Sequence, residues 1–142
     1  PSWYAEGTAT GFECYTWDDT KGRLDVTPLN RFMAKRLKQD IAAGTGLSLS
    51  AVLAGDAHEA NDGGNEASQR FYSSAWGLFY YLQHAESPLV REGMKKLEAA
   101  QASRGFSGSP ASAAAMFQEA LGDPVAFEAG WRAFILSLSV EP

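Results

Sequence analysis

Residues 71–82 have the sequence Phe-Tyr-Ser-Ser-Ala-Trp-Gly-Leu-Phe-Tyr-Tyr-Leu, which is the most aromatic segment of the chain. It belongs to a predicted helix over about 69–85 in which apolar or aromatic side chains fall on nearly every side. Such a helix is stable only when other elements surround it. We therefore expect the helix at 69–85 to lie in the middle of the hydrophobic core.

The surrounding elements are marked by prolines that follow a residue able to cap a helix. Such a pair is typical of an N-cap followed by the first helical residue, and it occurs as Thr27-Pro28, Ser87-Pro88, Ser109-Pro110 and Asp123-Pro124. The pairs predict helices over 28–43, 88–103, 110–121 and 124–139. The first is expected to bury Leu29, Phe32, Met33, Leu37 and Ile41. The second is expected to bury Leu89, Val90, Met94 and Leu97.

Shorter elements fill the remaining sequence. Residues 1–15 are largely apolar and predict an opening helix, the second central one. A short β-hairpin is expected near residues 15–27, with a turn over residues 17–22 and a strand at 23–26. Leu47 to Leu53 predicts a short helix or turn closed by Gly55. Residues 54–68 are rich in Gly, Asn and Asp without periodicity, so they predict one long loop.

The fold class that follows is mainly α, with a single bundle-like helical domain over residues 1–142. A chain of this length fits one domain with a real core. It begins with Pro1 rather than Met, so we expect it to be a processed product or an excerpt of a longer protein.

Charge and composition exclude several classes of function. The net charge of −5 and the pI near 5.0 argue against a nucleic acid as partner. No apolar run is long enough for a membrane span. Cys14 is the only cysteine, so an internal disulfide and a cysteine-rich zinc cluster are both excluded.

Glu6 is a carboxylate inside the apolar opening helix. Burying a charge costs several kcal/mol unless it is paired or bound to a metal. Glu6 therefore needs a partner, unless it is simply a first-turn carboxylate stabilised by the helix dipole. Glu13 follows seven residues later, two helical turns on, which predicts the same helix face.

The phrase Trp3-Tyr4-Ala5-Glu6-Gly7-Thr8-Ala9 resembles the W-x-x-E-G-x-A pattern of gluzincin zinc metallopeptidases, most of all an uncharacterised bacterial branch of that superfamily (peptidase clan MA). In gluzincins an HExxH helix supplies two zinc histidines and a general base, and the Glu of the E-G phrase is the third ligand. The resemblance thus implies that Glu6 is a zinc ligand. It also implies that Glu13 orients a ligand through a hydrogen bond, although a plain surface role for Glu13 stays open.

Two further stretches resemble the same family. Residues 72–78 resemble its Y-x-x-[AG]-x-x-[LV] helix, whose tyrosine points at the tetrahedral intermediate in the aminopeptidase branch. The resemblance implies that Tyr72 stabilises the oxyanion, whereas its helical spacing alone equally fits a core residue. Residues 127–135 resemble the family's terminal L-E-x-x-W-x-x-[FY]-[IVL] helix.

The sequence departs from the family because it contains no HExxH. The nearest string is His58-Glu59-Ala60-Asn61-Asp62, which follows Glu6 and lies in the predicted loop, so we interpret it as a coincidence. The acidic residues of this loop could also suggest calcium, but they lack the EF-hand order of ligands.

Two hypotheses follow. In the first, the chain is the C-terminal part of a metallopeptidase-like catalytic domain, a hydrolase that uses zinc on a peptide or protein substrate once joined to the upstream half of that domain. We then expect the isolated chain to bind no stoichiometric zinc and to hydrolyse no peptide. In the second, the chain is a non-catalytic helical interaction domain or a pseudopeptidase. No residue indicates a compartment, and only the family resemblance suggests export.

Overall fold

The computed structural model describes residues 1–25, 28–104 and 109–141. The described residues form eight helices and one antiparallel hairpin, so the mainly α fold is confirmed. In chain order the elements are α1 (Ser2–Phe12), β1 (Thr16–Asp18), β2 (Arg23–Asp25), α2 (Arg31–Ala42), α3 (Leu49–Ala54), α4 (Ala57–Asp62), α5 (Asn65–His84), α6 (Pro88–Arg104), α7 (Pro110–Leu121) and α8 (Pro124–Ser137).

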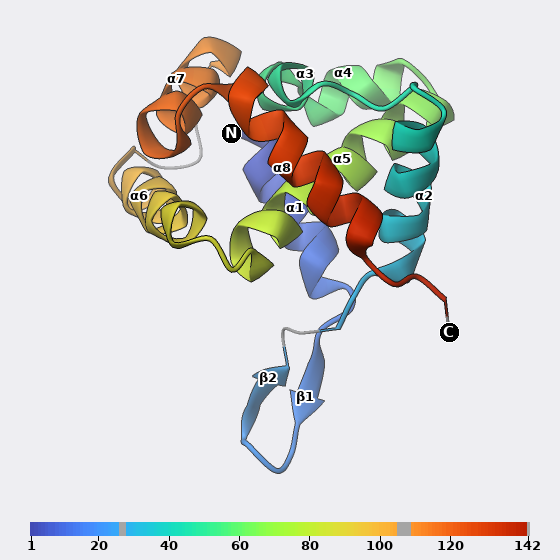
Figure 1. Cartoon of the computed structure of the whole chain (residues 1–142), viewed down its shortest axis with the longest axis vertical. Helices are drawn as coiled ribbons and strands as arrows, with labels where there is room; N and C mark the ends of the chain where they lie inside the picture. The colour runs from blue at the N-terminus through green and yellow to red at the C-terminus, as the bar shows by residue number, and fades with distance from the viewer. Residues whose placement is uncertain (26–27, 105–108, 142) are drawn as a thin grey trace.

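Helix α5 occupies the middle of the molecule, as its sequence predicts. Figure 1 shows α8 crossing in front of α1 and α5, with α2 on one side and α6 and α7 on the other. The buried residues of α5 are Phe71, Ser73, Ser74, Ala75, Trp76, Gly77, Leu78, Phe79 and Leu82. A helix buried on so many sides needs this enclosure.

Helix α1 makes the most extensive helix contact of α5, and the two run in the same direction. Gly7 lies against Ala75, Gly11 lies near Phe79, and the Tyr15 hydroxyl donates to the side-chain oxygen of Gln83 at 3.3 Å. The predicted pair of central helices is therefore present.

The predicted hairpin is also present and projects away from the helices in Figure 1. Its cross-strand partners are Thr16 with Asp25, Trp17 with Leu24 and Asp18 with Arg23. The Asp18 carboxylate accepts hydrogen bonds from the backbone N–H groups of Thr20 and Lys21, which closes the turn. Val26, which the predicted strand included, lies outside the described residues.

Two of the predicted caps are confirmed by hydrogen bonds. Ser109 Oγ accepts from the Ser112 N–H at the start of α7, and Asp123 Oδ1 accepts from the Val125 N–H at the start of α8. Helix α6 begins at Pro88 as expected. Each proline thus lies in the first turn of its helix, where a backbone N–H would have no intrahelical acceptor, so the missing N–H costs no hydrogen bond.

The predicted start of α2 at Pro28 is wrong. The helix begins at Arg31 with Asn30 as N-cap, whose Oδ1 accepts from the Met33 N–H at 3.1 Å. The Asn30 side-chain amide also donates to the carbonyl of Thr10 at 3.4 Å, so contact with α1 fixes this cap. Thr27, the predicted cap, lies outside the described residues.

The prediction of one long loop over 54–68 is wrong as well, because α4 and the first turn of α5 lie within it. Asp56 caps α4 by accepting from the backbone N–H groups of His58 and Glu59. The Ala57 N–H donates to Ser2 Oγ at 3.0 Å. A six-residue helix is too short for visible periodicity, and this one depends on a partner from α1.

Two residues predicted to be buried are exposed. Phe32 is 66% exposed and Leu89 is 83% exposed. The buried stripe of α2 is Ala34, Leu37 and Asp40, and Phe32 lies about 140° around the helix from Leu37. Leu89 lies in the first turn of α6, before Val90, Met94 and Leu97, which are buried as predicted.

Candidate active site

Helix α1 positions Glu6 beside the face that packs on α5. Trp3, Gly7, Thr10 and Gly11 form that buried face. Glu6 lies between Trp3 and Thr10 on one ridge of the helix, because residues three and four apart are neighbours. Its side chain is half-buried, and it makes no hydrogen bond or ion pair with any residue that the structure describes. The partner that the sequence requires is thus not found in the described ranges.

Position 7, directly after Glu6, must be a glycine because α1 and α5 pack closely there. A Cβ atom at this position would lie 2.6 Å from the carbonyl oxygen of Ala75 and 2.8 Å from the Cβ of Phe79. Backbone therefore packs on backbone at the crossing of α1 and α5. The backbone of Glu6 therefore has a fixed position along α1 relative to the crossing with α5.

Tyr72 lies on α5 three residues before Ala75, and its side chain is half-buried. Its hydroxyl oxygen accepts from the side-chain amide of Asn61 at 3.5 Å, and its ring lies edge-on to Phe71. Glu6 and Tyr72 thus come from two helices in direct contact, each within one turn of the Gly7–Ala75 crossing. No hydrogen bond joins the two side chains within the described chain.

Glu13 lies at the C-cap of α1, beyond the last helical residue, and is exposed. Seven residues correspond to about 10 Å along a helix, so Glu13 cannot hydrogen-bond to Glu6 itself. Its predicted role can therefore concern only a ligand other than Glu6, and it stays a prediction.

His58 and Asp62 lie on α4, where the sequence predicted a loop. They are four residues apart on one helix, and His58 Nε2 lies 3.7 Å from the Asp62 carboxylate. Both side chains are largely exposed. Within residues 1–25, 28–104 and 109–141, no three side chains of His, Cys, Asp or Glu converge as metal ligands would.

Two other acidic residues near α4, Asp56 and Glu66, already have structural partners. Asp56 caps α4, and Glu66 pairs with Arg36 and Arg70. Arg36 also donates from Nε to the buried Asp40 at 2.8 Å. The hydrogen bonds to Asp40 and then to Glu66 raise the pKa of the Arg36 guanidinium. This network joins α2 to α5, and its residues are therefore not free for calcium.

Glu128 has a role that the sequence does not indicate. One carboxylate oxygen accepts from the Leu49 N–H at 2.8 Å, and the other accepts from Arg132 Nε at 2.7 Å. Arg132 in turn donates to the carbonyl of Leu47 at 3.1 Å. Glu128 thus caps α3 from α8, because the first N–H groups of a helix lack intrahelical acceptors. Only the family-like helix at 127–135 singled it out.

Asn61 is the second residue that sequence reasoning missed. It accepts from Ser68 Oγ at 2.7 Å through its side-chain oxygen and contacts Tyr72 through its nitrogen. No sequence signal could have found it, since the prediction placed it in a loop.

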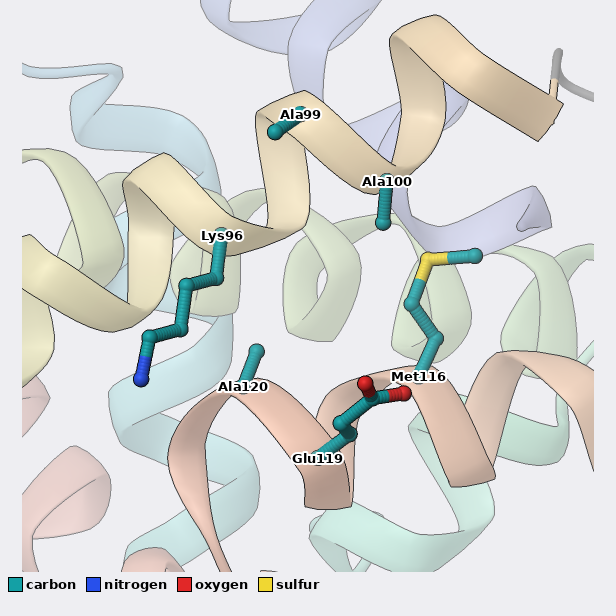
Figure 2. Close-up of a pocket in the computed structure, with 6 residues that line it drawn as sticks. All are labelled: Lys96, Ala99, Ala100, Met116, Glu119 and Ala120. Carbon is teal, nitrogen blue, oxygen red and sulfur yellow. The ribbon is translucent and has the colours of Figure 1, made fainter.

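Two cavities among the described residues lie apart from Glu6 and Tyr72. Figure 2 shows one of about 260 Å³ between α6 and α7, lined by Lys96, Ala99, Ala100, Met116, Glu119 and Ala120. Neither Glu6 nor Tyr72 lines it. Another, of about 310 Å³, includes His84, whose pKa is lowered by burial.

None of the described helices is long and apolar enough to cross a membrane. No family model matches the chain, and neither a curated protein nor a solved structure is significantly similar to it.

Proposed function

We propose that this chain is the C-terminal portion of a gluzincin-like zinc metallopeptidase domain that hydrolyses peptide bonds in the intact protein. In this proposal Glu6 is the third zinc ligand and Tyr72 stabilises the oxyanion. The motifs around Trp3, Tyr72 and Trp131 support it, and so does the contact between the two helices that carry Glu6 and Tyr72.

The observation that carries the proposal is the half-buried carboxylate of Glu6, which has no hydrogen-bond or ion-pair partner among the described residues and lies next to a backbone-to-backbone helix crossing. A surface carboxylate of no function would extend into water or pair with a nearby cation. Glu6 instead occupies a ridge between the buried Trp3 and Thr10. A half-buried carboxylate without a partner among the described residues fits one ligand of a zinc ion.

Glu6 alone cannot hold zinc, which needs three protein ligands in a catalytic site. The two histidines and the general base would come from another segment of the intact protein. When bound, zinc supplies the Lewis acidity that activates water for attack on a peptide carbonyl. The isolated chain is therefore inactive in this proposal.

Tyr72 contributes through its hydroxyl. The phenol oxygen accepts from Asn61, and no described residue accepts the hydroxyl hydrogen. That hydrogen is free to stabilise negative charge that develops on a carbonyl oxygen, and such stabilisation is often the largest single catalytic effect.

The test uses the complete natural polypeptide that contains this chain, with a quenched fluorescent peptide as substrate. We expect Glu6→Gln to remove both zinc and hydrolysis. We expect Tyr72→Phe to keep the zinc and to lower kcat by about 10²–10³. Glu119→Gln and Tyr15→Phe are the matched controls, since they lie on other surfaces. Full activity in Glu6→Gln would rule out the proposal.

A helical interaction domain is the second candidate, and one observation favours it. Leu89 and Val125 are 83% and 72% exposed. Leu89 borders an apolar cavity of about 250 Å³ that also includes Tyr81 and Phe127. Exposed apolar surface of this kind marks contact sites. This candidate predicts that the complete polypeptide contains no zinc, so the same experiment separates the two.

A further inference from the structure

We propose that Asn61 is a positioning residue that aims the hydroxyl of Tyr72 at the reacting carbonyl. This inference rests on the proposed function. It concerns a residue on α4, the helix that forms where the sequence predicts a loop.

Asn61 is fixed at both its backbone and its side chain. Its carbonyl accepts from the Gly64 N–H at 3.1 Å at the end of α4. Its side-chain oxygen accepts from Ser68 Oγ at 2.7 Å, and its side-chain nitrogen donates to Tyr72 at 3.5 Å. Ser68 and Tyr72 are four residues apart and so lie on one face of α5. The amide therefore bridges two side chains on adjacent turns.

The direction of the Asn61–Tyr72 hydrogen bond decides what the phenol can do. A phenol hydroxyl has one hydrogen to donate and lone pairs to accept with. With the Asn61 nitrogen donating to its oxygen, Tyr72 accepts on that side. Its own hydrogen must point elsewhere, and within the described chain no acceptor receives it. The hydroxyl is thus oriented in advance, which is how a donor stabilises an oxyanion without reorganising.

Helix α4 is itself held in place by α1. The Ala57 N–H donates to Ser2 Oγ at 3.0 Å, at the start of the helix that carries Glu6. The helix that carries Glu6 thus also contacts the start of the helix that carries Asn61. This connection accounts for an ordered six-residue helix in a segment rich in Gly, Asn and Asp.

The contact is tested first in the 142-residue chain. We expect Tyr72→Phe to shift the side-chain amide NMR signals of Asn61, and we expect the control Tyr15→Phe to leave them unchanged. Unshifted Asn61 signals in Tyr72→Phe would overturn the inference, whatever the activity of the protein.

The role is then tested in the complete natural polypeptide with zinc and a peptide substrate. We expect Asn61→Ala and Asn61→Asp to lower kcat about tenfold with KM unchanged, because both lose the donor. In a Tyr72→Phe background the same changes should have no further effect. Asn65→Ala, on the same surface, is the control.

The failures are distinguishable. An active wild type in which Asn61→Ala lowers kcat equally with and without Tyr72 overturns this inference alone. A wild type that holds no zinc and hydrolyses nothing overturns the proposed function, and the catalytic role of Asn61 with it.

Discussion

Gly7 lies directly against the backbone of Ala75, so closely that a Cβ on Gly7 would be 2.6 Å from the Ala75 carbonyl oxygen. This crossing sets the distance between α1 and α5, and hence between the helix of Glu6 and the helix of Tyr72. The candidate site therefore depends on a contact that only glycine permits.

Gly7→Ala tests the closeness of this crossing. We expect the free energy of unfolding to fall by about 1–3 kcal/mol, because the added methyl group must push two packed backbones apart. Urea denaturation measures the loss. Gly11→Ala is the matched control on the same face, since its nearest new neighbour would be at 3.6 Å. If both changes have the same effect, the crossing is not as tight as described.

Glu128→Ala tests the cap that α8 provides for α3. The change removes the acceptor of the Leu49 N–H and of Arg132, so we expect a loss of about 1–3 kcal/mol in unfolding free energy. Glu128→Gln keeps one acceptor and should lose less. Glu119→Gln, an exposed control on α7, should stay within about 0.5 kcal/mol of wild type. Equal stability of Glu128→Ala and wild type would contradict the assigned cap.

Arg36→Ala tests the ionic network between α2 and α5. Asp40 is only 6% exposed, and without Arg36 its nearest cation is Arg70, at 3.9 Å. A buried carboxylate that loses its partner is costly. Because Arg36 is itself partly exposed, we expect a loss of about 1–3 kcal/mol. The double change Arg36→Ala, Asp40→Asn should recover part of it, and additive losses would argue against coupling.

His84 predicts a pH dependence of stability. Burial lowers its pKa from the usual 6.5, and its Nε2 is buried without a hydrogen-bond partner in the described chain. The ring lies against Tyr80 and shares a cavity with Gln83, Arg91 and Glu98. The unfolded chain thus binds a proton more readily than the folded one. The contribution of His84 is fully present above about pH 6.5 and is lost as the pH falls toward its folded pKa.

The measurement is the unfolding free energy at several pH values between 5 and 8, an interval of about three units around the ordinary histidine pKa. His84→Gln should flatten the fall, whereas His58→Gln, with a ring that is 86% exposed, should not. A fall of unchanged size in His84→Gln would show that other groups cause it.

The large helices could be predicted because their signals are local. Ser109 and Asp123 cap helices by accepting from residues two or three positions later in the sequence. The apolar side chains on nearly every side of residues 71–82 require a central position in the core. The start of α2 could not be predicted, because Asn30 gains a hydrogen bond from contact with Thr10, twenty residues earlier. Pro28 predicted an earlier start, but residues 28–30 are not helical.

The candidate site likewise contains parts that the sequence predicts and parts that it does not. Trp3, Gly7 and Trp131 carry both family-like motifs and core packing, so the helices around them were predictable. Asn61 and the cap formed by Glu128 were not, because each depends on a partner far along the chain or on a helix without periodicity. The exposure of Leu89 was missed because a leucine in a first helical turn looks the same whether it faces a core or solvent.

The zinc content of the complete natural polypeptide shows directly whether Glu6 is a zinc ligand. This role of Glu6 predicts about one zinc per polypeptide with Glu6 present, its loss in Glu6→Ala, and no stoichiometric zinc in calorimetric titration of residues 1–142 alone, because one carboxylate is too few ligands. Tight zinc binding by residues 1–142 alone, or an unchanged zinc content in Glu6→Ala, would contradict it.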